Sequence, residues 1–134
     1  MNPKLPTVAW RSFAKVDPEK EYVVQITYLP LKSFWKVIKF FRLTLLIQRQ
    51  LESSPGLIGY SLKSKIVAHR FWTLSAWESQ KDLSSFVVKM PHLKVMQDLK
   101  NDMGQTKFVR WPARGSSLPV DWKEAMKKLE KTEV

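Results

Sequence analysis

The chain has 134 residues, and 23 basic against 12 acidic side chains give it a formal net charge of +11. This length fits one domain, and a hydrophobic fraction of 44% supplies a core and argues against disorder. Cysteine is absent, which excludes disulfides, thiolate nucleophiles and cysteine-based metal sites. The opening MNPKLPTVAW lacks the apolar run of a secretory signal, so we expect a cytoplasmic protein.

The positive charge is spread along the chain and is not gathered in one run. Such a surface attracts polyanions in general, and an anionic membrane surface is one alternative partner. No signature of nucleic-acid binding, such as an aromatic RNP-type strand, accompanies the charge. The sequence therefore predicts a solvated basic surface without a specific nucleic-acid partner.

The first half of the sequence predicts an arm, a strand and a long helix. Residues 1–20 contain three prolines and a polar cluster, which favours an extended N-terminal arm before a single domain over 21–134. Residues 21–31 are rich in β-branched and aromatic side chains, which is typical of a strand. A helix follows over 34–54, with Ser33 as its cap and the sequence SPG as its stop signal.

This helix is apolar enough to raise the question of a membrane. At 100° steps the basic residues fall on one side, and most large apolar residues, Ile38 and Leu45 among them, fall on the other. Cations at this spacing exclude a spanning helix. Trp35, Leu43 and Leu46 border the basic side, so an interfacial membrane helix is an alternative to an ordinary helix that packs on the core.

The second half predicts a hairpin, further helices and a fourth strand. The hairpin strands are 57–66 and 67–77, with their connection near Lys65. A helix opened by Ser79 follows, and the segment after Pro91 either continues it beyond a kink or begins a new helix. The sequence ends with a strand over 106–115 and a helix over 118–131.

The order βαββαβ predicts a ferredoxin-like α+β fold with an extra C-terminal helix. Right-handed crossovers place both crossover helices on one face of the sheet and leave the other face bare. Both parities of the 68–77 strand are largely apolar, which is typical of a sheet covered twice. The simplest second cover is another copy of the chain, packed sheet on sheet as a homodimer.

The run RFWTLSAWESQKDLSSFVVKMPH, together with PGLIGYSL, resembles the dimeric α/β-barrel superfamily. This superfamily includes the antibiotic-biosynthesis, haem-degrading and spheroidene monooxygenases, and the stretch KFVRWPARGSSLPVDWKEAMKKL is similar to the end of an uncharacterised bacterial family within it. The resemblance covers about residues 21–131 and implies the fold more strongly than the chemistry.

Five residues are candidates for a site between sheet and helices: His92 as the catalytic residue, and Trp72, Trp77, Tyr60 and Phe86 as substrate-binding residues. The two tryptophans are five residues apart, so a regular strand points them to opposite faces, and only one can line such a site. Histidine is the side chain best able to act as acid, base or metal ligand near neutral pH. Core packing is the alternative explanation for the tryptophans, and a structural hydrogen bond is the alternative for His92.

The resemblance implies two chemistries. Haem-degrading relatives combine a helix histidine with a strand tryptophan and an asparagine on the first strand, but this strand offers only Gln25 and Thr27. Cofactor-independent relatives act on a reduced aromatic substrate that supplies its own electrons to oxygen, and their protein contributes a dry pocket and a proton acceptor. No phosphate loop, nucleophile elbow, HExxH motif or paired strand carboxylates occur, and no metal site is expected.

The sequence therefore predicts a monooxygenase-like protein, with the cofactor-independent oxidation of a flat hydrophobic or aromatic substrate as the leading hypothesis. A non-catalytic binder of haem or another hydrophobic ligand is the first alternative. A dimeric module that binds membranes peripherally through its basic helix is the second.

Overall fold

The computed structural model describes residues 8–65 and 67–131. Within them the strands are β1 (Val8–Ser12), β2 (Glu21–Pro30), β3 (Leu57–Lys65), β4 (Arg70–Trp77) and β5 (Lys107–Arg114). The α-helices are α1 (Val37–Glu52), α2 (Gln80–Val88), α3 (His92–Leu99) and α4 (Trp122–Glu130). The segment after Pro91 thus begins a new helix, and residues 34–36 form a short 3-10 turn before α1.

The strands form one antiparallel sheet in the order β1-β3-β4-β2-β5. From β2 to β5 the path is the predicted βαββαβ, with the second crossover divided into the two helices α2 and α3. The predicted ferredoxin-like α+β fold is thus confirmed. Residues 8–12 of the predicted arm add a fifth strand at the β3 edge, and residues 1–7 lie outside the described residues. The ring of Trp10 covers Gly59 of β3, where a Cβ atom would come within 2.6 Å of the indole.

Two predicted helix caps are present. The Ser33 hydroxyl accepts a hydrogen bond from the Trp35 backbone N–H at 3.2 Å, and the Ser79 hydroxyl accepts one from that of Asp82 at 3.2 Å. Each satisfies a donor that the first helical turn leaves without a partner. The sequence signals for these two helix starts are thus confirmed.

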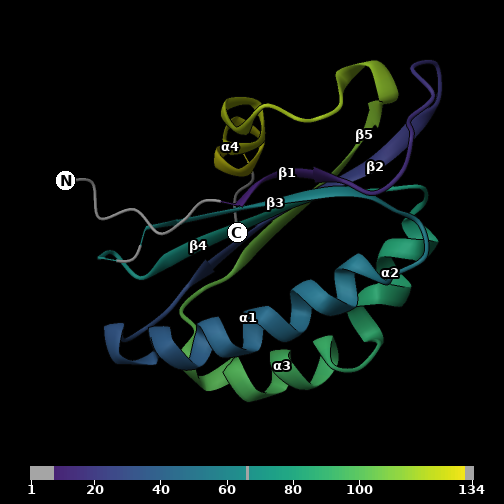
Figure 1. The fold of residues 1–134 in the computed structure, drawn as a ribbon. Coiled ribbons are helices and arrows are strands. Elements are labelled where there is room, and N and C mark those ends of the chain that lie inside the picture. Colours follow the sequence, from purple (N-terminus) through teal and green to yellow (C-terminus); the bar gives the residue numbers. More distant parts are fainter. Residues whose placement is uncertain (1–7, 66, 132–134) are drawn as a thin grey trace.

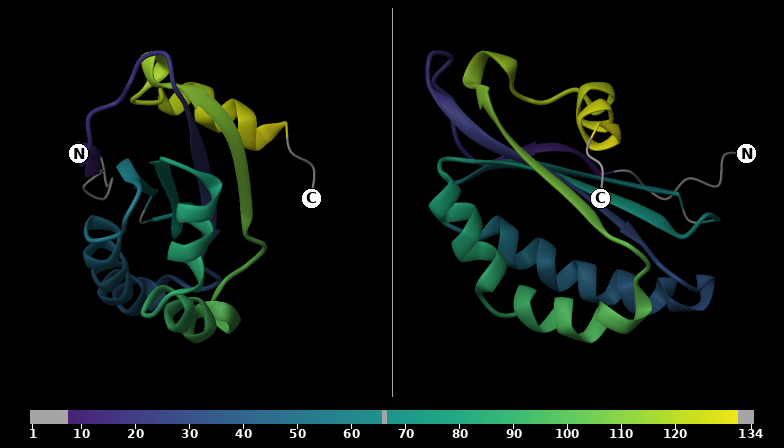
Figure 2. Two further views of the ribbon diagram at one scale, coloured as in Figure 1. Left: turned by 90° about the vertical axis from the view of Figure 1, so that its right-hand side faces the viewer. Right: turned by 180° about the vertical axis from the view of Figure 1, so that it is seen from behind.

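Helices α1, α2 and α3 cover one face of the sheet, and α1 and α3 lie side by side (Figures 1 and 2). The apolar side chains beneath them form two clusters. The first contains Leu31, Val37, Phe40, Phe71, Val95 and Leu99. The second contains Leu51, Leu57, Tyr60, Trp77, Leu83 and Phe86.

The opposite face of the sheet, which was expected to be bare, carries α4 (Figure 1). Ala125 and Leu129 of α4 join a buried cluster with Trp72 and Leu74 of β4, and the indole N–H of Trp122 donates to the hydroxyl of Ser61 at 3.1 Å. The chain's own last helix therefore covers apolar residues of this face. A homodimer through the sheet face stays a prediction.

The distribution of apolar residues around α1 differs from the helical-wheel prediction. Ile38 and Leu45 were assigned to the core side, but both are exposed on the outward side. They lie one turn before Arg42 and Arg49 respectively, which places them among the cations, whereas Phe40 points to the core. The assignment of Ile38 and Leu45 was therefore wrong.

Candidate functional site

The predicted site residues lie on two faces of the sheet. Trp77, Tyr60 and Phe86 share one cluster beneath the helices, and His92 contacts Phe86. Trp72 points to the opposite face, where it packs near Tyr28 in the cluster that α4 covers. The prediction that the two tryptophans face opposite ways is confirmed, and Trp72 is separated from the other four residues by the sheet.

Three aromatic rings form a continuous row from the sheet to the helices. Trp77 stands at the end of β4, and its ring centroid lies 5.3 Å from that of Phe86 in α2. The Phe86 ring lies 4.8 Å from the ring of His92, the first residue of α3. The indole N–H of Trp77 donates to the Ser75 hydroxyl at 2.9 Å, so its one polar group is satisfied while the ring is fully buried.

Two hydrogen bonds fix His92 between α1 and α2. Its backbone N–H donates to the side-chain oxygen of Gln50 at 2.8 Å, and its ring Nδ1 lies 2.9 Å from the carbonyl oxygen of Val87. Because a carbonyl only accepts, Nδ1 carries the proton and Nε2 keeps a lone pair. Nε2 has no hydrogen-bond partner in the part of the chain that the structure describes.

Burial lowers the pKa of His92, and the hydrogen bond to Val87 only partly opposes this effect. The side chain is therefore a neutral imidazole at pH 7, with Nε2 ready to accept a proton. A neutral, half-buried imidazole against an aromatic wall is the form that a general base requires before reaction.

The lowered pKa of His92 predicts a specific acid sensitivity of the fold. Below about pH 6.5 the unfolded chain binds a proton at this histidine more readily than the folded chain, so the free energy of unfolding falls as the pH falls. We expect His92→Gln to lose this part of the dependence. Urea unfolding between about pH 5 and pH 7 measures it.

Asp102 also has a lowered pKa, owing first to its hydrogen bond with Lys39, but it titrates below this window. Equal slopes of unfolding free energy against pH in wild type and His92→Gln would contradict the assignment of the acid sensitivity to His92.

Tyr60 lies in β3, at the centre of a polar network that joins three elements. Its hydroxyl donates to Glu52 at 2.7 Å and accepts from Arg11 at 3.3 Å and from Gln48 at 3.4 Å. Burial raises the pKa of Tyr60, and the hydrogen bond to Glu52 raises it further, so the phenol stays neutral. Its hydroxyl is thus fully occupied in holding β1 and α1 to β3.

A band of polar side chains crosses the helix-facing side of the central strands. None of these residues was among the five site candidates predicted from the sequence. Gln25 pairs with Ser75 and with Arg110 in the strand register, and Thr27 pairs with Thr73. All five side chains are half-buried. The Arg110 guanidinium donates to the Gln25 side-chain oxygen at 2.6 Å and forms no ion pair with any described residue.

The sequence contains part of the information that locates this polar band. Gln25 and Thr27 share one parity of a strand whose other parity is Tyr22, Val24 and Ile26, and this pattern marks them as neighbours on one face. Arg110 could not be added to them from the sequence, because the pairing of β5 with β2 joins segments 85 residues apart.

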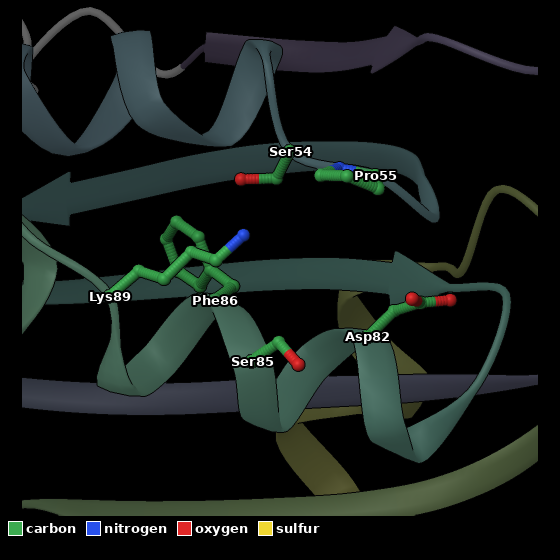
Figure 3. A pocket seen from close by; sticks show the side chains of 6 residues that line it. All are labelled: Ser54, Pro55, Asp82, Ser85, Phe86 and Lys89. Atoms are coloured by element: carbon green, nitrogen blue, oxygen red, sulfur yellow. The ribbon is translucent and has the colours of Figure 1, made fainter.

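A pocket of about 110 Å³ opens between the end of α1 and α2 (Figure 3). Phe86 provides its aromatic wall, and the other lining residues are Ser54, Pro55, Asp82, Ser85 and Lys89. A dry protein cavity of ~150 Å³ holds one benzene molecule, so this pocket matches a group no larger than a single ring. On the sheet side of Phe86 there is no opening to solvent at Trp77 and Tyr60, since both side chains are fully buried.

The residues around His92 do not fit a haem. The ring of His92 rests on Phe86, and the pocket of about 110 Å³ that Phe86 lines is well below the ~300 Å³ that even small drug-sized ligands occupy. No group of three or more potential metal ligands gathers among the described residues. The described residues therefore offer no haem site beside His92.

Comparison with solved structures identifies the fold. A candidate antibiotic biosynthesis monooxygenase from Nitrosomonas europaea superposes with a TM-score of 0.62 at 21% identity, over 69% of this chain and 89% of that one. The chain has the ferredoxin-like α+β fold of the antibiotic biosynthesis monooxygenases. The fold implied by the sequence resemblance is thus confirmed.

Two further neighbours share this fold. The cofactor-independent oxygenase SnoaB from Streptomyces nogalater superposes with a TM-score of 0.59 at 12% identity, over 73% of this chain and 97% of that one. A candidate monooxygenase from Fusobacterium nucleatum gives 0.67 at 9% identity, over 75% of this chain but only 46% of its own length. The sequence matches no protein-family model and no curated protein.

Proposed function

We propose that this protein is a small monooxygenase that needs no cofactor and oxidises an aromatic substrate beside His92. The observation that carries the proposal is the neutral His92, whose Nε2 has no hydrogen-bond partner among the described residues. Its ring contacts Phe86, which packs on Trp77 and lines the pocket. Its structural neighbours include a cofactor-independent oxygenase, and this likeness supports the same class of reaction.

The size of the pocket favours a substrate whose reacting part is a single ring. A hydroquinone is the simplest such compound, because it supplies all the electrons that the reaction consumes. One hydroquinone and one O₂ give one hydroxyquinone and one water: one oxygen atom enters the ring and the other leaves as water. No external reductant is required.

In this reaction His92 removes the phenolic proton through Nε2 and becomes a cation, while its Nδ1–H remains bound to Val87. The phenolate that results is a far better electron donor to O₂ than the phenol. Stacking on Phe86 orients the ring and shields it from water, and buried Trp77 supports Phe86 from the sheet side.

The test is oxygen uptake by the purified protein with methylhydroquinone and with anthrone, corrected for autoxidation in buffer and with heat-denatured protein. We expect catalysed uptake with the single-ring substrate and one atom of ¹⁸O per product molecule when ¹⁸O₂ is supplied. Uptake at the autoxidation rate with both compounds would refute the proposal. A haem absorption band that depends on His92, without turnover, would instead establish the ligand-binding alternative.

A further inference from the structure

The outward face of α1 and the turn before it carry large apolar side chains in contact with solvent. Trp35 is 85% exposed, Ile38 73%, Leu45 58% and Leu46 41%. Counted from Trp35, these residues occupy positions i, i+3, i+10 and i+11 of one helix face, opposite the buried Val37, Phe40 and Leu51. Large apolar side chains gathered on one exposed helix face mark an interaction site.

The same face is cationic. Arg42 and Arg49 lie between the apolar residues and are exposed, and neither forms an ion pair with a described residue. Lys36 and Lys39 flank them and share one carboxylate, that of Asp102, at 3.7 and 2.8 Å. No acidic residue occurs in the sequence between Glu21 and Glu52, so α1 has no negative charge before its last residue.

The position of α1 makes this face accessible to a flat surface. Helices α1 and α3 form the outer layer on one side of the sheet, and α4 lies on the opposite side (Figures 1 and 2). With 16 residues, α1 is about 24 Å long at ~1.5 Å per residue. No helix in the described part of the chain is long and apolar enough to cross a bilayer.

We infer that α1 docks on an anionic membrane surface, with Trp35, Ile38 and Leu45 inserted at the headgroup level and Arg42 and Arg49 against lipid phosphates. An amphipathic helix with aromatic and aliphatic residues on one side and Lys and Arg around them is the form that lies in the interface plane. Tryptophan is the residue that favours this depth. Membrane docking is independent of the proposed oxygenase activity, since it uses the side of α1 that faces away from His92.

Charge decides between a bilayer and a second copy of the chain. A two-fold contact through this face would bring Arg42 and Arg49 of one α1 against the same cations of the other, with no acidic residue of α1 to compensate them before Glu52. Anionic lipid phosphates compensate the same cations. The apolar residues and the cations of α1 thus both favour an anionic bilayer over a second copy of the chain.

The test is co-sedimentation of the full-length protein with vesicles of phosphatidylcholine that contain about one third phosphatidylglycerol. We expect binding at about 0.1 M salt, weaker binding at about 0.5 M salt and little binding to pure phosphatidylcholine. The variant Arg42→Ala/Arg49→Ala should bind roughly 25-fold more weakly, because each basic residue near such a surface contributes about fivefold. Trp35→Ala/Ile38→Ala/Leu45→Ala should lose about tenfold or more.

The matched control is Lys123→Ala/Lys127→Ala, which removes two exposed charges from α4 on the opposite side of the sheet. We expect it to bind within about threefold of wild type, because charges beyond the Debye length of about 10 Å are screened. Equal losses in this control and in the arginine variant would overturn specific docking by α1. So would absence of binding, or a triple variant that binds vesicles normally but turns an oligomer into a monomer in light scattering.

Discussion

Replacing His92 by glutamine is expected to lower kcat/KM for hydroquinone oxidation by about 10²–10⁴-fold while the protein stays folded. Glutamine can still donate to the Val87 carbonyl, but it has no basic nitrogen to take the phenolic proton. The pH profile carries the same information. Because burial lowers the pKa of His92, the acidic limb of the wild-type profile should lie below pH 6.5, and the residual activity of the variant should lack that limb.

The matched control for this substitution is the other histidine, His69, in the turn between β3 and β4. Its φ of 45° favours asparagine as the replacement, since asparagine tolerates this backbone region. His69→Asn should retain the wild-type rate. A His92→Gln protein with a normal urea transition and activity within twofold of wild type would show that His92 is not the base.

The fold could be predicted because its signals are local. The alternation of β4 set the faces of Trp72 and Trp77, and the cap residues Ser33 and Ser79 marked where helical structure begins. Strand β1 was missed because five residues in a proline-rich arm show little pattern of their own, and their partner is the distant β3. Pairing with β3 satisfies the backbone groups of an edge strand, which no local signal reports.

Helices α1 and α4 show where a local pattern is insufficient. In α1 almost every turn is apolar on more than one side, so a helical wheel alone could not say which stripe meets the sheet, and Ile38 and Leu45 were assigned to the wrong one. The amphipathic pattern of α4 predicted a helix, but where it docks depends on the path of the chain after β5. That path brings Ala125 and Leu129 onto the sheet face that a second subunit was predicted to cover.

The candidate site also contains contacts that only the tertiary structure reveals. The row Trp77–Phe86–His92 assembles residues that sequence reasoning had chosen singly, because β4, α2 and α3 are consecutive in the chain. Arg110 was not among them, since nothing near it in the sequence points to Gln25. Local sequence patterns identify candidate residue types. Only the pairing of distant strands shows which of these residues are in contact.

Replacing Trp77 by alanine is expected to have the largest effect on stability of any single substitution considered, because this side chain is fully buried and supports both Phe86 and the β4 end. Removal of a buried tryptophan costs about 3–5 kcal/mol in free energy of unfolding, out of the ~5–15 kcal/mol that a domain has in total. For a chain of this size we expect Tm to fall by roughly 10 °C or more. Thermal and urea unfolding measure both quantities.

The cavity left by Trp77→Ala offers a second readout that separates packing from a general loss of structure. Added indole has the size and the N–H donor of the missing ring, so it should bind beside Ser75 and Phe86 and raise the Tm of the variant but not that of wild type. Trp35→Ala is the matched control, because Trp35 is 85% exposed and its removal should change the free energy of unfolding by less than about 0.5 kcal/mol. Equal destabilisation by the two substitutions would contradict the burial of Trp77, and with it the aromatic wall on which the proposed reaction depends.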